Sequence, residues 1–581
     1  MLRDASSRQP RKRTGLPPLL LPRTRCSTND GAVILLDAAP HGASRAVEPR
    51  RLLARYGPAA ACLVALLTVA LWQDWQFRHY WLDDPFISFR YAWNLVHGHG
   101  LTYNPGEHVE GFSNPSWTLL SAGALAAGLD PVLVSKALGL SLHLALIVLV
   151  WSGARRRVPR CTPGAMRFAD LVALLPAALA AALVATSGWT ALWALAGLET
   201  PLFAFALAAA VVAYSRERRT AAAALLLLAA LTRLEGVVFG LAFVVVLLRE
   251  QGLSRQAKRS LLIFLVPFTA VLLGRIAYYG HPLPNSYTDK TGLPLAAGLH
   301  AGTRYLTASL RTAWGAPVGL QPLHQSVMPV LGLLVGTSLA LLWGLVRAST
   351  ARGAARWLAA AFVWLVVAIT VGGGGDWMPA ARFLVPAVPL VALALGWALT
   401  ALLDHRPLLL ASVHGIAAAT GVVVSAAVVL MLAQGQQANV RAAVARYQPS
   451  GSPAVDRNPR YVAMAAWLRE NARPGDLVGI EEAGLIPYET PQLRYLDLFG
   501  LTDETIARGQ GTPPFDKHDD TYVLALRPRY LVIWGVPDAR GGFRWSHQLS
   551  LVEDRRFTSA YRPRLTTAKD PIYTFIVYER R

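Results

Sequence analysis

Two adjacent carboxylates, Asp83 and Asp84, follow the first long apolar run of the chain. The apolar residues Trp81 and Leu82 precede them directly, so we expect these carboxylates at a partly desolvated membrane edge. Desolvation raises the pKa of a carboxyl group, and a raised pKa suits a general base at neutral pH. The alternative for one of the two is helix capping, because Asp is favoured at the N-cap. For the pair we favour catalysis or ligand binding.

Cationic side chains that could hold an anion occur near three other apolar runs. They are Arg233, Lys290 and Arg382. A guanidinium can bind a phosphate group through two hydrogen bonds, and a lysine ammonium acts as a point charge. Two alternatives stay open: these side chains could snorkel to lipid headgroups, and Arg233 could instead pair with Glu199 or Glu235.

These candidates lie in five polar segments that separate the apolar runs. The segments cover residues 81–117, 197–201, 232–236, 278–290 and 372–383. Polar groups at membrane depth are costly and usually face a cavity or one another. In the topology described below, all five segments fall on the outer side, which predicts a single polar cavity there.

Four further residues complete the candidate set. They are His281, Asn285, Asp376 and Trp377. Asp376 follows four glycines whose spacing is not that of a phosphate-binding loop, so a flexible turn is an equal alternative. A lone histidine such as His281 is more often a structural hydrogen-bonding residue than a ligand. The sequence has no metal-binding spacing such as HExxH and indicates no cofactor, and assistance by a divalent cation is left open.

The composition indicates what kind of chain must position these residues. Of the 581 residues, 54% are hydrophobic and 16% are charged, which argues against one soluble domain and against disorder. A net charge of +21 would indicate nucleic-acid binding in a soluble protein. Here, however, Lys and Arg lie in short loops between long apolar runs, as the positive-inside rule predicts. We therefore predict a mostly α, multi-pass membrane protein that binds membrane lipids and no nucleic acid.

Apolar runs and their charged flanks predict about eleven membrane spans. They are Tyr56–Trp75, Pro131–Trp151, Phe168–Ser187, Thr200–Tyr214, Ala221–Leu234, Val237–Leu248, Leu261–Tyr279, Val327–Val346, Trp357–Val371, Phe383–Leu403 and Leu408–Leu432. With a cytoplasmic N-terminus, this order places the basic loops in the cytoplasm. Ser116–Leu129 is too short for a span and would invert the pattern, so we expect it to lie at the outer interface.

Three regions follow from this topology. Residues 1–55 are expected to be a disordered basic cytoplasmic tail, residues 56–432 the transmembrane bundle with a first periplasmic loop over 76–130, and residues 433–581 an extracytoplasmic α/β domain. In the last region, helical periodicity covers Tyr461–Asn471. Its β-like runs are Leu477–Ile480, Tyr495–Leu498, Tyr530–Trp534 and Ile572–Tyr578.

Together these motifs resemble the polyprenyl-phosphate-dependent glycosyltransferases of the glycosyltransferase-C superfamily, especially bacterial terminal β-(1→2)-arabinofuranosyltransferases. The resemblance rests on Asp83–Tyr91, Gly100–Glu107, Gly197–Leu202, Pro284 and Asn285 with Lys290, Gly375–Phe383, and Asp497–Asp503 with Ile506–Arg508. The first motif and Gly375–Pro379 are the most specific. One departure is Pro85, where many relatives have a small residue.

The resemblance implies a glycosyltransferase-C bundle in the bacterial inner membrane that acts in cell-envelope and cell-wall biogenesis. The donor would be an arabinofuranose or mannose-like sugar on polyprenyl phosphate, and the acceptor an extracytoplasmic glycan, lipid or protein. By position, Asp83 or Asp84 would be the general base of an inverting transfer, and we prefer Asp83. Because phosphate is already a good leaving group, the carboxylate pair that hydrolases need is not required.

The other candidates are expected to surround the substrate. Arg382 and Lys290 would hold the phosphate by charge stabilisation in a poorly hydrated site. Asp376 would orient Arg382 or touch the sugar. The expected lining of the cavity is completed by Glu199, Arg233, Glu235, His281, Asn285 and Trp377.

Two other functions would also place polar groups in a membrane bundle. A transporter or flippase for a lipid-linked saccharide is expected to carry them near the midplane, often in repeated halves, and the sequence shows neither pattern. In a non-catalytic cell-envelope assembly protein, the acidic pair would have no functional role. Both stay as alternatives to the glycosyltransferase.

Overall fold

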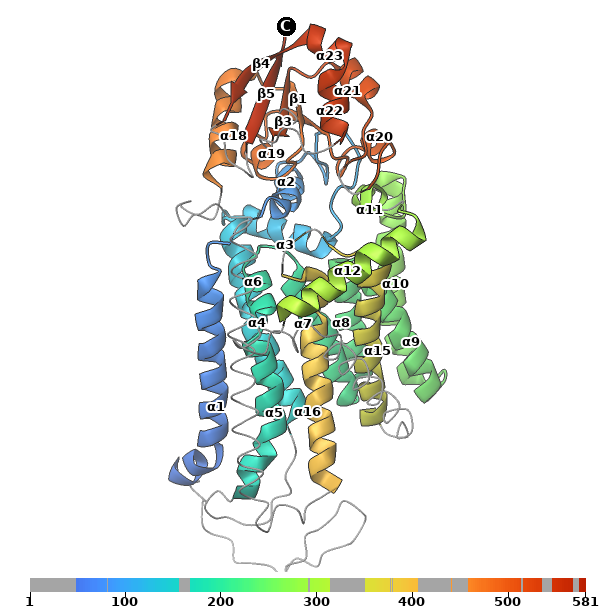
Figure 1. Cartoon of the computed structure of the whole chain (residues 1–581). Coiled ribbons are helices and arrows are strands. Elements are labelled where there is room, and N and C mark those ends of the chain that lie inside the picture. The colour runs from blue at the N-terminus through green and yellow to red at the C-terminus, as the bar shows by residue number, and fades with distance from the viewer. Residues whose placement is uncertain are drawn as a thin grey trace, which may run out of the picture.

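A computed structural model of the chain places a helical bundle below a smaller α/β domain (Figure 1). The structure describes residues 49–80, 82–155, 168–290, 293–313, 351–376, 378, 380–405, 440, 458–513, 516–535, 546–567 and 574–581. Outside the described residues lie most of the expected basic tail, two predicted spans, and Trp377. These spans are Val327–Val346 and Leu408–Leu432. The side chain of Lys290 is also outside what is described.

The described part of the bundle consists of fourteen α-helices and one 3-10 helix. Their bounds are α1 Pro49–Gln76, α2 Asp84–Val96, α3 Pro115–Ala126, α4 Pro131–Ala154, α5 Phe168–Ala185, α6 Gly188–Ala194, α7 Thr200–Ser215, α8 Arg219–Thr232, α9 Gly236–Gln251, α10 Arg255–Tyr279, α11 Asn285–Lys290, α12 Leu295–Ala313, α15 Ala351–Gly372, η1 Arg382–Leu384 and α16 Ala387–His405. Proline lies in the first turn of α2, α3, α4 and α7, where its missing N–H breaks no helical hydrogen bond. These prolines fix where the site-bearing helices begin.

Five helices in the described part are long and apolar enough to cross a membrane. They cover Gly57–Gln76, Pro131–Ala154, Arg255–Tyr279, Gly353–Gly372 and Arg382–Thr400. Each overlaps a predicted span. The predicted span Phe168–Ser187 overlaps the first helix of a pair, Ala173–Ala185 and Gly188–Ala194, that is bent by 57°. α7 and α8 are shorter apolar helices. Multi-pass membrane character is therefore supported, while the count of eleven spans and their sidedness stay predictions.

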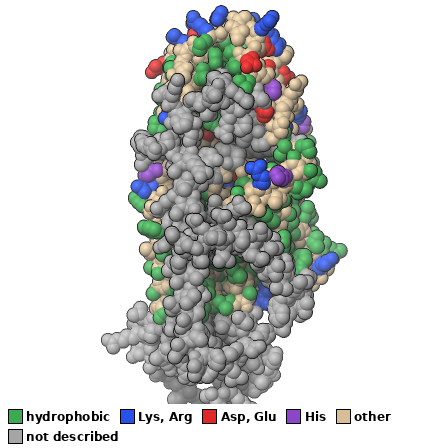
Figure 2. Space-filling model, viewed as in Figure 1, with side chains coloured by type: hydrophobic (Ala, Val, Ile, Leu, Met, Phe, Trp, Pro, Cys, Tyr) green, Lys and Arg blue, Asp and Glu red, His purple; other side chains and the backbone are tan. Residues whose placement is uncertain are grey.

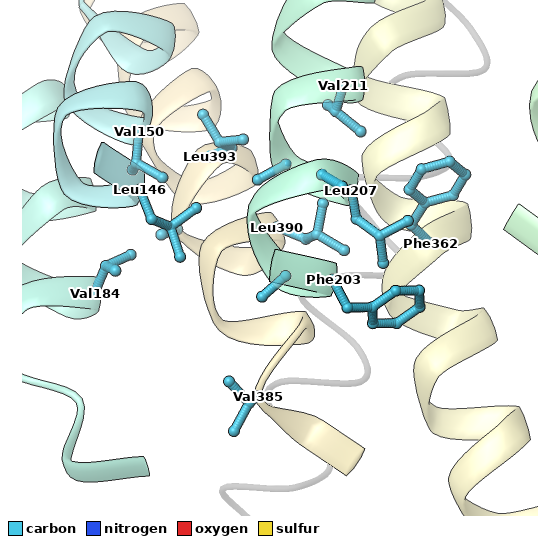
Figure 3. Close-up of a cluster of buried hydrophobic side chains, with 14 of the residues drawn as sticks. Leu146, Val150, Val184, Phe203, Leu207, Val211, Phe362, Val385, Leu390 and Leu393 are labelled. Atoms are coloured by element: carbon cyan, nitrogen blue, oxygen red, sulfur yellow. The ribbon is translucent and has the colours of Figure 1, made fainter. Parts of the chain in front are cut away.

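Apolar side chains from five helices pack together in the core of the bundle. Figure 3 shows Leu146 and Val150 of α4, Val184 of α5, Leu207 and Val211 of α7, Phe362 of α15, and Leu390 and Leu393 of α16. Small residues let the backbones approach closely, as is common in membrane bundles. A Cβ at Gly139 of α4 would lie 2.0 Å from the carbonyl oxygen of Ala194. This contact fixes the segment that leads from α6 into Glu199.

The C-terminal domain, residues 458–581, is built on a five-stranded sheet. Its elements are α18 Pro459–Asn471, β1 Leu477–Ile480, α19 Leu485–Glu489, β2 Arg494–Asp497, α20 Glu504–Ala507, α21 Asp520–Leu526, β3 Tyr530–Gly535, α22 Ser546–Glu553, α23 Arg555–Ala560, β4 Tyr561–Thr566 and β5 Thr574–Arg580. The strand order is β2-β1-β3-β5-β4; β1 runs parallel to β2 and β3, and β5 runs antiparallel to β3 and β4. All four predicted strands overlap observed ones, and β4 was not predicted.

The first loop of the bundle and the C-terminal domain share one hydrophobic cluster. Phe86, Phe89 and Tyr103 pack in it together with Leu485 and Tyr495. Figure 1 shows α2 directly beneath α19 at this junction. In the face seen in Figure 2, charged side chains gather on the C-terminal domain and hydrophobic ones on the described part of the bundle. That distribution is expected if lipid surrounds the bundle alone.

Candidate functional site

Asp83 joins the membrane bundle to the C-terminal domain. Its Oδ2 and Oδ1 atoms accept hydrogen bonds from the backbone N–H groups of Gly484 and Leu485, each at 2.7 Å. Asp83 stands at the N-cap position of α2 but makes no capping hydrogen bond to that helix. Only glycine fits at position 484, because a Cβ there would lie 2.1 Å from the carbonyl oxygen of Asp83. The simple capping alternative is therefore wrong for Asp83.

Burial makes the Asp83 carboxyl a proton acceptor at neutral pH. Desolvation raises its pKa to about 7, the backbone N–H of Leu485 opposes that change, and the nearby charge of Asp84 adds to it. Glu482, two residues before Gly484, has a pKa raised well above its ordinary value by burial and by Asp83. Like charges this close do not ionise together, so protonation is shared within the group. Such a group can accept a proton from a substrate hydroxyl.

Three other residues of the first loop hold the C-terminal domain in place. Arg90 is buried and donates hydrogen bonds to the carbonyl oxygens of Tyr103, Pro487 and Leu493. The Tyr103 hydroxyl donates to the carbonyl oxygen of Ala483 at 2.6 Å. Asn104 exchanges two hydrogen bonds with the Tyr495 backbone, at 2.8 and 2.9 Å. The segment after β1 and the beginning of β2 are thereby fixed against the segment that carries Asp83.

A second polar group, which we name the arginine cluster, lies where several helices end. It comprises Glu199, Arg233, Glu235, Asp376 and Arg382. Arg233 donates to Glu199 at 2.7 Å and to Glu235 at 2.9 Å, and Arg382 Nε donates to Asp376 at 2.7 Å. Arg233 is therefore in an internal ion pair, as the sequence alternative stated. Asp376 is paired with Arg382, and its role in orienting this arginine for a substrate stays a prediction.

A strained turn positions Arg382. Ala380 and Ala381 precede it with φ of 58° and 52°, a left-handed conformation that is unfavourable for alanine. The indole Nε1 of Trp193 donates to the carbonyl oxygen of Ala380 at 2.9 Å and holds the turn. The guanidinium carbons of Arg382 and Arg233 lie 5.1 and 5.2 Å from the centroid of the Phe383 ring. Both cations therefore border one aromatic ring.

A pocket opens beside the arginine cluster. About 340 Å³ of space lies between its walls, and part of this space is open solvent. Its polar lining includes Thr200, Arg233, Glu235 and Arg382. Its apolar lining comes from α7, α9, α15 and the segment just before α16. Asp376 occupies only Nε of Arg382, and within the described residues no partner binds the two terminal nitrogens. Such a fork can bind an anion through two hydrogen bonds.

Asn114 connects the arginine cluster to α2. Its Oδ1 accepts a hydrogen bond from Ser88 Oγ at 2.9 Å, and its Nδ2 donates to Glu199 at 2.9 Å. Ser88 lies one helical turn after Asp84, so both face the same side of α2. Asn114 and Glu482 were missed in the sequence because a neutral amide and a glutamate in a polar domain carry no distinctive pattern.

Two predicted cavity residues lie elsewhere. The Asn285 side chain donates to the carbonyl oxygens of Gly500 and Leu501, at 2.8 and 3.2 Å, and does not line the pocket. His281 is half-exposed, 3.5 Å from a carboxylate oxygen of Glu504. Both are contacts to the C-terminal domain. In the part of the chain that the structure describes, no group of three or more His, Cys, Asp or Glu residues is placed to hold a metal ion.

Comparison with known proteins identifies the fold. A family model described as a domain of unknown function (DUF8728) matches residues 444–576, and no curated protein matches the sequence. The structure of ArnT from Cupriavidus metallidurans bound to undecaprenyl phosphate is similar, with a TM-score of 0.50 and 15% identity over 90% of this chain and 98% of that chain. The apo form of the same protein gives a TM-score of 0.48 and 16% identity with the same coverage.

The first of these similarities shows that the chain has a fold like that of ArnT. The predicted glycosyltransferase-C superfamily agrees with this fold and stays a prediction. The finer resemblance to arabinofuranosyltransferases stays a prediction. At 15% identity, the residues of the site must be argued from their own geometry.

Proposed function

We propose that the chain is a membrane glycosyltransferase that takes its sugar from a polyprenyl-phosphate donor. The observation that carries this proposal is the link from α2 to the arginine cluster through Ser88, Asn114 and Glu199. A base and an anion site are the two parts that such a transfer needs. The ArnT-like fold, and the undecaprenyl phosphate bound in ArnT, support polyprenyl phosphate as the carrier.

In this mechanism the acidic pair accepts the proton of the acceptor hydroxyl. We keep Asp83 as the preferred base because its pKa of about 7 suits proton transfer at neutral pH. The N–H groups of Gly484 and Leu485 fix its two oxygens, and each oxygen retains a second lone pair. The acceptor oxygen then bonds to the anomeric carbon, which inverts, while the bond to phosphate breaks and the phosphate leaves with its electron pair.

The leaving phosphate is assigned to the arginine cluster. Arg382 presents its two terminal nitrogens beside the pocket, and Asp376 fixes the guanidinium through Nε. Arg233 adds a second cation that Glu199 and Glu235 hold in place. The predicted contribution of Lys290 stays part of the proposal. The apolar lining from α9 and α15 suits the first isoprene units of the lipid.

The sugar and acceptor follow the sequence resemblance. We propose arabinofuranose or a mannose-like sugar, and a glycan, lipid or protein acceptor on the extracytoplasmic side of a bacterial inner membrane. The contact between the acidic pair and the C-terminal domain supports an acceptor that approaches from that domain.

A transfer assay tests this function. Purified full-length protein in lipid nanodiscs receives radiolabelled polyprenyl-phosphate arabinofuranose or mannose together with a matching oligosaccharide. We expect labelled, elongated oligosaccharide, and loss of about 10²- to 10⁴-fold in rate for Asp83→Asn. Movement of intact donor across a proteoliposome membrane without product would instead indicate a flippase, and binding without either result an assembly protein.

A further inference from the structure

Thr200 is a buried hydroxyl of the pocket that neither the fold nor the ion pairs use. It is the first residue of α7, directly after Glu199, and its exposed fraction is 1%. In the described part of the chain its Oγ1 atom is buried without a hydrogen-bond partner. A buried hydroxyl that leaves its hydrogen bond unmade destabilises the fold, so such groups in native proteins call for an explanation.

Thr370 provides a contrast within the same pocket. It lines the opposite wall, on α15, and is as deeply buried as Thr200. Its hydroxyl, however, donates to the carbonyl oxygen of Val366 at 2.7 Å, one turn earlier in the helix. Thr370 therefore has the ordinary hydrogen bond of a helical threonine, whereas Thr200 does not.

The position of Thr200 suggests what would complete its hydrogen bond. It lines the pocket together with Arg233 and Arg382, both of which present cationic groups to the same small volume. A phosphate group offers several acceptor oxygens and can bind the Arg382 fork and a hydroxyl at once. A sugar hydroxyl would satisfy the threonine equally well, but it would not engage both terminal nitrogens of Arg382 as a phosphate can.

We infer that Thr200 donates a hydrogen bond to the phosphate of the lipid carrier, as the neutral third member of a phosphate subsite with Arg382 and Arg233. This inference rests on the proposed function and deepens it. Neutral donation matters here because three carboxylates, Glu199, Glu235 and Asp376, already offset the charge of the two arginines, so hydrogen bonds must contribute to holding the phosphate. A hydroxyl strengthens the subsite without adding charge to a poorly hydrated region.

Removal of the Thr200 hydroxyl is expected to affect the stability of the unliganded protein and its affinity for the lipid in opposite directions. The two measurements together therefore distinguish a ligand-binding role from a structural one. Without ligand, Thr200→Val removes an unpaired hydroxyl and keeps the shape of the side chain, so the melting temperature is expected to stay the same or to rise. With ligand, the same change removes a hydrogen bond to a charged group. Affinity is then expected to fall about 10- to 100-fold.

The experiment measures binding of undecaprenyl phosphate to the full chain in detergent, and thermal unfolding with and without this lipid. Undecaprenyl phosphate has no sugar, so any effect reports on the phosphate. Thr200→Ser should restore affinity to within about threefold of the wild type, because it keeps the hydroxyl. The control is Thr186→Val, which removes the hydroxyl of a buried threonine directly after α5, outside the pocket, and should change affinity by less than about threefold. Inorganic phosphate should bind far more weakly, because only the lipid form contacts the apolar wall.

The outcomes separate this inference from the proposed function. If the wild type binds undecaprenyl phosphate and Thr200→Val binds it equally well, the Thr200 role is overturned while the glycosyltransferase stands. If the unliganded melting temperature of Thr200→Val falls, the hydroxyl supports the fold, for example through bound water, and the inference is again overturned. If the wild type binds inorganic phosphate as tightly as the lipid, the subsite is not one for a lipid carrier. If the wild type binds no polyprenyl phosphate at all, the proposed function fails too.

Discussion

The carboxylate of Asp83 accepts a hydrogen bond at 2.7 Å from the backbone N–H of Gly484, a residue 401 positions later in the chain. The contact fixes the beginning of α2 against the end of β1, and it leaves no room for a side chain at position 484. The C-terminal domain is thus part of the candidate site, because it sets the position and the proton affinity of the preferred base.

Gly484→Ala should weaken this junction. The new Cβ would meet the carbonyl and carboxylate oxygens of Asp83, and backbone atoms cannot move away cheaply. We expect a loss of about 1–3 kcal/mol in stability, the usual cost of overpacking, and faster proteolysis of the C-terminal domain. Gly123→Ala is the control, because a Cβ there meets no atom within 4 Å. Equal stability of the two variants would show that the Asp83 contact is dispensable.

The transfer rate should depend on pH through Asp83. Its pKa is raised to about 7 by burial and by Asp84, so kcat/KM should rise about tenfold per pH unit below pH 7 and level off above it. Asp84→Asn removes a negative neighbour, which lowers the pKa of Asp83 and moves this limb to lower pH. A pH profile from 5 to 9 measures both effects. A pH-independent rate over that range in the wild type would argue against a carboxylate base.

The same raised pKa has the opposite effect on stability. The folded protein keeps a proton on Asp83 that the unfolded chain releases near its ordinary pKa of 3.8. The free energy of unfolding should therefore decrease as pH rises from about 4 to about 7, and this decrease should be smaller in Asp83→Asn. Denaturant unfolding in detergent at several pH values tests it. An identical pH dependence in both proteins would mean that Asp83 is not the group concerned.

Asn114→Leu should separate the acidic pair from the arginine cluster. The change removes the hydrogen bonds to Ser88 and Glu199 and leaves both partners buried, at a cost of about 1–3 kcal/mol each. We expect a fall of at least tenfold in transfer rate. Ser116→Ala is the control, since it removes a nearby hydrogen bond, to Thr232, that is outside this link. If both variants lose activity equally, the effect belongs to packing of α3 and not to the link.

Arg382→Lys should weaken donor binding while the protein stays folded. Lysine keeps the charge but loses the planar fork that Asp376 orients, so the KM for the polyprenyl-phosphate donor should rise about 10- to 100-fold. Asp376→Asn should raise KM less, because the guanidinium stays but is oriented less firmly. An unchanged KM in Arg382→Lys would place the phosphate elsewhere.

The sequence predicted those parts of the fold that have strong local patterns. β1 matches its predicted run, Leu477–Ile480, because β-branched and apolar residues there are bounded by turn residues. Strand β4 was missed because Arg562, Pro563 and Arg564 read as polar and irregular. On an edge strand whose central residues are exposed, proline and charges are acceptable.

Only the charged residues of the candidate site could be singled out from the sequence. Glu199, Arg233 and Arg382 stood out because ionisable residues beside apolar runs need a reason. Asn114 and Thr200 were not recognised, because a neutral polar side chain carries no such signal until its partner is seen. The hydrogen bond between the Gly484 N–H and the Asp83 carboxylate could not be predicted from the sequence, because no local pattern connects residues 401 positions apart.

A structure of the full chain with undecaprenyl phosphate tests the central claim most directly. We expect the phosphate in the pocket beside Arg382 and Arg233, with the lipid along the apolar wall formed by α9 and α15 and the acidic pair within reach of the bound headgroup. A phosphate bound elsewhere, with this pocket empty, would contradict it.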